Sequence, residues 1–146
     1  MKILVINGPN LNFLGKRDAK LYGKITLAQI MAQLVKIADK ADIKLEVFQS
    51  NHEGAIIDFL QNDTSRLARG ILINPGALTH YGYSLRDALI DTKLPLIEIH
   101  LSDPDTRESF RKIDVLDGVT VKKFKGLQQK SYYQGLEYLI NLLKKK

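Results

Sequence analysis

Polar side chains gather in three short stretches of the chain, each next to a run of apolar residues. The stretches are NGPNLN at residues 7–12, NPGALTH at residues 74–80 and EIHLS at residues 98–102. Their amides, hydroxyls and histidines suit the binding of a small, highly oxygenated molecule. Asn and Gly are also common turn residues, so any one stretch alone could be an ordinary turn. Three of them at corresponding places favour a binding site.

A tyrosine and an arginine offer acid–base chemistry nearby. Arg17 and Tyr22 follow the first polar stretch. A free phenol has a pKa near 10, but a cation close to its hydroxyl favours the phenolate and makes it a usable base. The alternative is that Tyr22 packs against its neighbours while Arg17 faces solvent, and spacing alone does not decide. A histidine such as His100 could supply the matching acid near neutral pH.

The connection that carries this pair is long. It runs for about 20 residues between an apolar run and a helical pattern, a length that is typical of functional loops. Gly15 and Gly23 could serve as its hinges. We therefore expect a single catalytic domain over residues 1–146, with a mobile lid loop at about residues 14–24.

The elements that must position these groups alternate between strand and helix. Apolar runs predict strands at residues 2–6, 43–48, 70–73, 94–100 and 118–124. Helical spacing predicts helices at residues 27–41 (after Thr26 as N-cap), 55–60, 83–90 and 133–143, with a short helical piece up to Phe110. This order predicts an α/β fold: a flavodoxin-like, doubly wound, parallel five-stranded sheet with helices on both faces. Ligands of such sheets bind beyond the carboxyl ends of the strands, where the polar stretches lie.

The composition is that of a soluble globular protein. Of the 146 residues, 45% are hydrophobic and 26% are charged, and this length predicts one domain. There is no cysteine, which excludes disulfides and thiolate metal sites. The apolar run at residues 3–6 is too short for a signal peptide or a membrane span. We therefore expect a cytoplasmic protein with no membrane partner.

The formal charge of +6 has three interpretations. It could reflect a well-solvated surface, which we favour, or attraction of an acidic metabolite, or nucleic-acid binding. No nucleic-acid motif accompanies the charge, so we expect no nucleic-acid partner. Neither G-x-G-x-x-G nor a P-loop occurs, which argues against the common nucleotide enzymes. Metal-ligand spacing is missing too, and we expect neither metal nor cofactor.

The polar stretches belong to an ordered series of motifs. Besides those named, the series holds LG at 14–15, Arg17, YG at 22–23, TL at 26–27, QSNHEG at 49–54, INPGA at 73–77, LRDA at 85–88, IEIHLS at 97–102, and RE at 107–108 with FR at 110–111. This series resembles the type II 3-dehydroquinate dehydratase family as far as about residue 116. Each motif alone is weak, but the ordered set is highly specific.

The resemblance implies a cofactor-free lyase that removes water from 3-dehydroquinate by anti elimination through an enolate. It implies that Tyr22 is the base and that Arg17 keeps Tyr22 ionised. His100 would be the acid that protonates the departing hydroxyl, and Glu98 would orient it. Asn10 would stabilise the enolate, through a water molecule.

The resemblance also implies how the substrate is held and how subunits assemble. The side chains of Asn74, His80 and Arg111 would hold substrate hydroxyls. The backbone amides of Leu101 and Ser102, at a helix start, would bind the carboxylate. Asp87 would reach the site of a neighbouring subunit. The expected assembly is a dodecamer built from trimers.

Several residues depart from the family pattern or keep two interpretations. Tyr81, Gly82 and Tyr83 follow the Thr-His pair where small residues are common, Asp103 replaces a commoner Asn, and residues 123–130 lack the usual Gly-Phe-Gly spacing. These departures concern the assembly and the substrate affinity. We favour a structural role for His52, whereas Arg107 is either a site arginine or a surface partner of Glu108.

Two other function classes stay open at this point. One is a flavodoxin-like binding module for a flavin or another small ligand, without catalysis. The other is a basic nucleic-acid-binding protein, which only the charge suggests. The missing phosphate-binding loop argues against the first of these.

Overall fold

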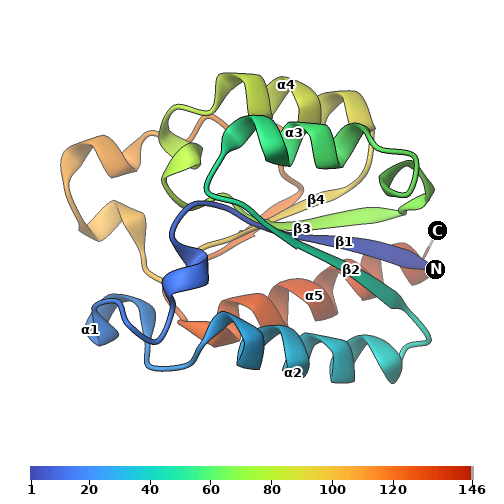
Figure 1. Cartoon of the computed structure of the whole chain (residues 1–146), viewed down its shortest axis with the longest axis horizontal. Coiled ribbons are helices and arrows are strands. Elements are labelled where there is room, and N and C mark those ends of the chain that lie inside the picture. The colour runs from blue at the N-terminus through green and yellow to red at the C-terminus, as the bar shows by residue number, and fades with distance from the viewer. Residues whose placement is uncertain (146) are drawn as a thin grey trace.

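A parallel sheet of five strands forms the centre of the computed structural model, which describes residues 1–145 (Figure 1). The strands are β1 (Lys2–Asn7), β2 (Lys44–Gln49), β3 (Gly70–Asn74), β4 (Leu96–Ile99) and β5 (Lys122–Phe124). Their order across the sheet is β2-β1-β3-β4-β5, and every neighbouring pair is parallel. All strands therefore end at the same edge of the sheet.

Helices cover both faces of this sheet, so the molecule has three layers (Figure 1). On one face lie α2 (Leu27–Asp39) and α5 (Gln129–Lys144), and on the other α3 (Glu53–Gln61) and α4 (Tyr83–Thr92). The short helix α1 (Ala19–Tyr22) lies beyond the carboxyl ends of the strands. Within residues 1–145, no helix has the length and the apolar character needed to cross a membrane.

Five short 3-10 helices complete the connections. They are η1 (Leu11–Phe13), η2 (Ser65–Leu67), η3 (Gly76–His80), η4 (Pro104–Thr106) and η5 (Ser109–Lys112). Four of them, all except η2, lie in segments that follow the carboxyl ends of strands β1, β3 and β4. The loops that bear the polar stretches are thus ordered structures rather than extended linkers.

Alternation along the central strands divides the core into two halves. In β1, Ile3 and Val5 join the cluster beneath α2 and α5, whereas Leu4 and Ile6 join the cluster beneath α3 and α4. Because both faces are covered, β1 and β3 are continuous apolar runs, as is typical of buried parallel strands. Helix α5 approaches the sheet so closely that a Cβ atom at Gly135 would overlap the side chain of Ile99.

The predicted fold is confirmed, with corrections at element ends. Strand β5 begins at Lys122 instead of residue 118, because Gly118 adopts a positive φ and the next residues form a turn on the Leu116 carbonyl. Strand β4 is shorter than predicted, and α3 and α5 begin two and four residues earlier than expected. Thr26 is the N-cap of α2 as predicted, within a capping box with Gln29.

Candidate active site

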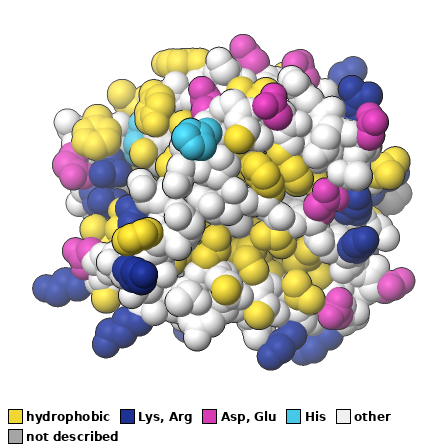
Figure 2. Space-filling model, viewed as in Figure 1, with side chains coloured by type: hydrophobic (Ala, Val, Ile, Leu, Met, Phe, Trp, Pro, Cys, Tyr) yellow, Lys and Arg dark blue, Asp and Glu magenta, His cyan; other side chains and the backbone are white. Residues whose placement is uncertain are grey.

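A cleft lies beyond the carboxyl ends of β1, β3 and β4. Nine of the eleven predicted site residues line it, namely Asn10, Arg17, Tyr22, Asn74, His80, His100, Leu101, Ser102 and Arg111. Glu98 lies fully buried next to His100, and Asp87 lies on the exposed side of α4, outside the cleft. Lys and Arg side chains are visible at this end of the molecule, at the left of Figure 2, and also at the opposite end. The cleft itself is lined by Arg17, Arg107 and Arg111, so it suits an anionic molecule.

The turns after β1 and β3 form one wall of the cleft. The Gly8 amide donates a 2.8 Å hydrogen bond to the Asn74 carbonyl, and a Cβ atom at Gly8 would overlap the backbone of Pro75. Only glycine allows this close approach. Asn10 follows in the left-handed conformation, with φ of 70°, and its amide donates to the side chain of Asn51 at 2.9 Å. The motif at residues 49–54 thus supports the loop of Asn10.

Short-range capping fixes the position of Tyr22. The Asp18 side chain accepts from the Lys20 amide at 2.9 Å and so caps the first turn of α1. Gly23 ends the helix with φ of 78°. Tyr22 is therefore the last residue of a small capped helix, which holds its half-buried ring beside the cleft.

Two guanidinium groups contact Tyr22, at different places. The Arg17 guanidinium stacks over the ring, with its central carbon 3.7 Å from the ring centroid. The Arg107 guanidinium instead donates to the Tyr22 hydroxyl, with 2.9 Å between Nη1 and the oxygen. The expectation that Arg17 acts on the hydroxyl is thus corrected, because the group that contacts the oxygen is Arg107. The alternative arrangement holds in part: Tyr22 packs against the core cluster beneath α2 and α5, but Arg17 packs on the ring face instead of facing solvent.

Both interpretations of Arg107 hold in part. Its weaker contact is the predicted one with Glu108, at 3.9 Å, while the Arg111 Nε atom binds the same carboxylate at 2.5 Å. The pKa of Glu108 is lowered by a backbone hydrogen bond and then by Arg111. Since Arg111 satisfies Glu108, Arg107 is available to Tyr22. The sequence offered both arrangements and could not choose between them.

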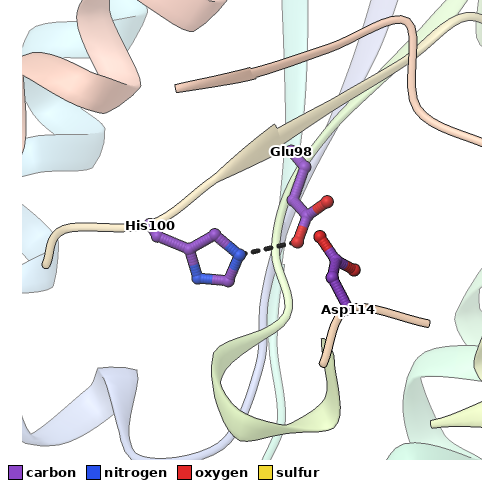
Figure 3. Close-up of side chains that lie close together, drawn as sticks. All are labelled: Glu98, His100 and Asp114. Carbon is purple, nitrogen blue, oxygen red and sulfur yellow. Dashed lines mark hydrogen bonds and ion pairs between the residues drawn. The ribbon is translucent and has the colours of Figure 1, made fainter. Parts of the chain in front are cut away.

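A histidine and a buried carboxylate form the second reactive pair (Figure 3). Nε2 of His100 lies 2.6 Å from Oε1 of Glu98, which also accepts from the Thr79 hydroxyl at 2.7 Å. An ionised carboxylate can only accept, so Nε2 carries hydrogen and Nδ1 is left to exchange a proton with a bound molecule. Glu98, two residues earlier in the chain, thus makes the contact with His100 that the predicted orienting role requires.

Other predicted binding residues are held by short contacts. The Asn74 side chain accepts from the Gly76 amide at 3.2 Å. Nδ1 of His80 lies 2.6 Å from the Ile113 carbonyl, which only accepts, so Nε2 is the acceptor atom of this ring. The ring of His80 also meets Phe110 edge-on, with 5.7 Å between centroids. Asn74 and His80 are therefore positioned before any ligand arrives.

The helix start expected after Leu101 and Ser102 is a weak one. Helix η4 has only three residues, so it adds little dipole to the backbone amides. The carbonyls of Leu101 and Ser102 accept from the amides of Gln128 and Gly126, both at 3.0 Å, and this fixes the orientation of the segment. The positive charge of the cleft comes instead from the three arginines at its lining, Arg17, Arg107 and Arg111.

Two of the residues that depart from the family pattern, Asp103 and Tyr81, can be placed relative to the cleft. Asp103 caps η4 through the Asp105 amide and pairs with Lys125 at 3.1 Å, so its charge is balanced. Lys125 also pairs with Asp105, and this contact lowers the pKa of the Asp105 carboxyl. Tyr81 is exposed and does not line the cleft. Of these residues, none blocks the cleft.

Three side chains beside the cleft were missed by the sequence analysis. Thr79, Asp114 and Lys123 surround Glu98, and donor atoms of Glu98, His100 and Asp114 lie within 4.8 Å of one another. Such a set could hold a metal ion, but the Lys123 ammonium pairs with Asp114 and supplies the positive charge there. Asp114 lies in no motif, and Lys123 reads as one of several lysines in a charged run. His52, which we expected to be structural, is the exposed N-cap of α3 and does not line the cleft.

Comparisons with known proteins agree with this geometry. A model of the dehydroquinase class II family matches residues 1–140. A 3-dehydroquinate dehydratase from Halothermothrix orenii is 44% identical, over 99% of this chain and 97% of its own. One from Roseiflexus castenholzii is 51% identical, over 96% and 88%. The crystal structure of a type II dehydroquinase from Butyrivibrio crossotus superposes with a TM-score of 0.90, at 44% identity, over 95% of this chain and 97% of that one. A type II dehydroquinase from Propionibacterium acnes gives 0.88, at 33% identity, over 96% of each chain. Sequence, fold and cleft together show that this chain belongs to the dehydroquinase class II family.

Proposed function

We propose that this protein is a 3-dehydroquinate dehydratase, a hydro-lyase of the shikimate or quinate pathway. The reaction removes a proton from carbon 2, beside the ketone, and the hydroxyl from carbon 1, which leaves as water. The C–H electron pair becomes the new double bond of 3-dehydroshikimate. The observation that carries the proposal is that a phenol held by arginines and a histidine held by a carboxylate line the same cleft.

The base in this proposal is Tyr22. Deprotonation beside a ketone needs a base and a means of holding the charge that develops. The Arg107 contact places a cation 2.9 Å from the phenol oxygen, where it can interact with the reacting group as the proton is transferred. Arg17 adds positive charge over the ring and holds the ring in place. We propose that both arginines serve Tyr22, with Arg107 as the one that binds the oxygen.

The acid in this proposal is His100. Expulsion of hydroxide is slow unless the departing oxygen is protonated. The buried Glu98 carboxylate stabilises the imidazolium and leaves Nδ1 to donate the proton. The enolate would be stabilised by Asn10, whose left-handed backbone is fixed by Asn51. An anti elimination places Tyr22 and His100 on opposite faces of the substrate ring.

The remaining cleft residues would hold the substrate. Its hydroxyls would meet Asn74, His80 and Arg111, and its carboxylate the amides of Leu101 and Ser102. The side chains of Asn74 and His80 and the backbone of Leu101 and Ser102 are already held by hydrogen bonds, which supports this assignment. Groups that are ordered in advance lose less conformational entropy when a ligand binds. No cofactor enters the proposed chemistry.

We further propose that residues 14–24 act as a lid. Arg17 and Tyr22 both belong to this segment, and it is bounded by Gly15 and Gly23, both with positive φ. A loop that carries the base can open for substrate entry and then complete the site. Arg107 would fasten the closed loop through the Tyr22 hydroxyl.

An assembly of trimers into a dodecamer is part of the proposal. Tyr83, Asp87 and Ile90 share one side of α4, at spacings of four and three residues, and the two apolar residues are 66% and 46% exposed, respectively. Exposed apolar groups around a carboxylate favour a subunit contact in which Asp87 enters a neighbouring cleft. A cytoplasmic location accords with this class of enzyme.

Addition of 3-dehydroquinate tests the activity directly. The conjugated enone of 3-dehydroshikimate absorbs in the ultraviolet, so turnover appears as a rise in absorbance. Substrate that carries deuterium stereospecifically at carbon 2 reports the geometry: anti elimination loses the hydrogen opposite the departing hydroxyl. If the protein left 3-dehydroquinate unchanged at every pH from 5 to 10, the proposed activity would be excluded.

A further inference from the structure

Two carboxylates lie side by side next to His100. Glu98 is fully buried, and Asp114, which follows η5, points its carboxylate toward that of Glu98 (Figure 3). Donor atoms of these two residues and of His100 lie within 4.8 Å of one another. The chemistry assigned to His100 uses only Glu98. A second negative charge at this distance must therefore either be neutralised or alter the histidine.

One hydroxyl group joins the two carboxylates. The Thr79 oxygen lies 2.7 Å from Oε1 of Glu98 and 2.8 Å from Oδ1 of Asp114. A hydroxyl has a single hydrogen, so it can donate to only one of them at a time. Without a cation beside it, the Asp114 carboxylate would act on the imidazole together with Glu98 and would hold the proton of His100 more tightly.

Lys123 of β5 supplies that cation. Its ammonium group forms an ion pair with Oδ2 of Asp114 and a second contact, of 3.2 Å, with the exposed Asp117. Burial alone would lower the pKa of Lys123. The hydrogen bond with Asp114 and then the charge of Glu98 outweigh burial, so the pKa lies well above its ordinary value. The pKa of Asp114 is likewise lowered: burial opposes this, and Lys123, Thr79 and the Leu116 amide outweigh it. The pair is thus fully charged at neutral pH.

From this geometry we propose that Asp114 and Lys123 are positioning residues for the elimination. They form a neutral pair that leaves Glu98 as the one unbalanced carboxylate beside His100, and so they set the pH range in which His100 holds its proton. The inference rests on the proposed role of His100 as the acid. It assigns a function to two side chains that do not line the main cleft.

Other charged groups also face His100. Those that border the same small hollow are Asp105, Arg111, Lys112 and Lys125. From the cleft side the charged or titratable groups are Arg17, Tyr22, His80, Arg107 and Arg111. Asp105 is paired with Lys125, and these groups stay constant in the variants below. The shift expected from Asp114 and Lys123 is therefore measured against a fixed background.

The test compares the pH dependence of kcat/KM in four variants. Asp114→Asn removes a negative charge within 4.8 Å of the histidine, so the alkaline limb, where the acid loses its proton, moves to lower pH. At that separation one charge shifts a titration by roughly 0.6 pH unit in water and roughly 2.5 units at an effective dielectric constant of 20. Lys123→Met moves the limb to higher pH. The double variant restores it, and Lys123→Arg leaves it in place.

A matched control removes an ion pair elsewhere. Lys2 and Glu46 pair at 2.7 Å, near the start of β1, and both are half-buried. Lys2→Met should leave both limbs of the profile where they are. If Asp114→Asn and Lys123→Met move the alkaline limb in the same direction, or by less than about 0.2 pH unit, the inference is overturned. A loss of rate at every pH without a shift would mean a merely structural role and would overturn it too.

A second readout separates this inference from the proposed activity. The chain has three histidines, so ring-labelled protein gives few NMR signals, and His100→Asn identifies the one that matters. Its titration midpoint should move down in Asp114→Asn and up in Lys123→Met. Wild-type protein that does not convert 3-dehydroquinate refutes the proposed function, while the NMR titration still decides whether the pair controls His100.

Discussion

Replacement of Arg107 by Met removes the guanidinium that donates to the Tyr22 hydroxyl, while it keeps an unbranched side chain. The contact is 2.9 Å long, and the Arg107 side chain is only 17% exposed. Hydrogen bonds to a charged partner contribute about 1.5–3 kcal/mol. If that energy is realised only when Tyr22 is a phenolate, then kcat/KM should fall by a factor of about 13 to about 160.

The assay is the initial rise of enone absorbance over a range of 3-dehydroquinate concentrations. Lys16→Met is the matched control, because Lys16 is a cation of the loop that carries Tyr22 and lies over the Phe13 ring, 5.4 Å from its centroid. We expect Lys16→Met to stay within about threefold of wild type, since exposed charges contribute little. Circular dichroism and thermal unfolding confirm that each variant folds.

The comparison with Arg17→Met makes the reasoning refutable. Arg17 lies over the ring face and Arg107 at the oxygen, so both losses should lower kcat/KM. An Arg107→Met enzyme with near-normal kcat/KM would show that the hydroxyl contact is irrelevant to the base. In that case the whole effect of the cations would have to come from Arg17.

Five further outcomes are expected. Tyr22→Phe should abolish turnover and leave the melting temperature within a few degrees of wild type, because only the phenol oxygen is lost. Sodium borohydride with substrate should not inactivate the enzyme, and chelators should not slow it, since neither a Schiff-base lysine nor a metal takes part in the proposed chemistry; loss of activity that added metal restores would contradict this. Asp114 has a lowered pKa from Lys123, Thr79 and the Leu116 amide despite its burial, so its ionised form contributes stability at pH values above the ordinary pKa of 3.8. This contribution is lost as the pH falls below that value. In urea unfolding, the difference in the free energy of unfolding between wild type and Asp114→Asn should therefore shrink at such low pH. Gly135→Ala should lower the free energy of unfolding by about 1–3 kcal/mol, because the new methyl group overlaps Ile99.

Much of the fold could be predicted because burial on both faces leaves a simple pattern. The runs that became β1 and β3 are apolar throughout and bounded by Asn and Gly, so their position and type were plain. Strand β5 was harder to predict. Val119 and Val121 are typical of strands, yet Val119 lies in the turn that includes Gly118, and the amide of Val121 is the first to donate to a carbonyl of β4, that of Leu96. The residue type alone does not show that Gly118 adopts a positive φ.

The site residues that lie in motifs could be predicted from the sequence. Those that meet only in the folded structure, from segments far apart in the chain, could not. Asn74 and His100 follow buried strands, so their place at the carboxyl edge follows from the fold. The partner of the Tyr22 hydroxyl depends on how the loop of residues 14–24 meets a segment 85 residues later, which spacing does not reveal. Asp114 and Lys123 come from different segments and meet only because β5 lies beside β4.

The close approach of Gly8 to Pro75 has a mechanical consequence for substrate entry. The loops that carry Asn10 and Asn74 interlock through backbone atoms, with no side chain between them that could yield. That side of the cleft is therefore a rigid wall. We therefore expect any widening that admits a ring-shaped molecule to come from the opposite side, where the Arg107 side chain joins residues 102–111 to residues 14–24 through the Tyr22 hydroxyl.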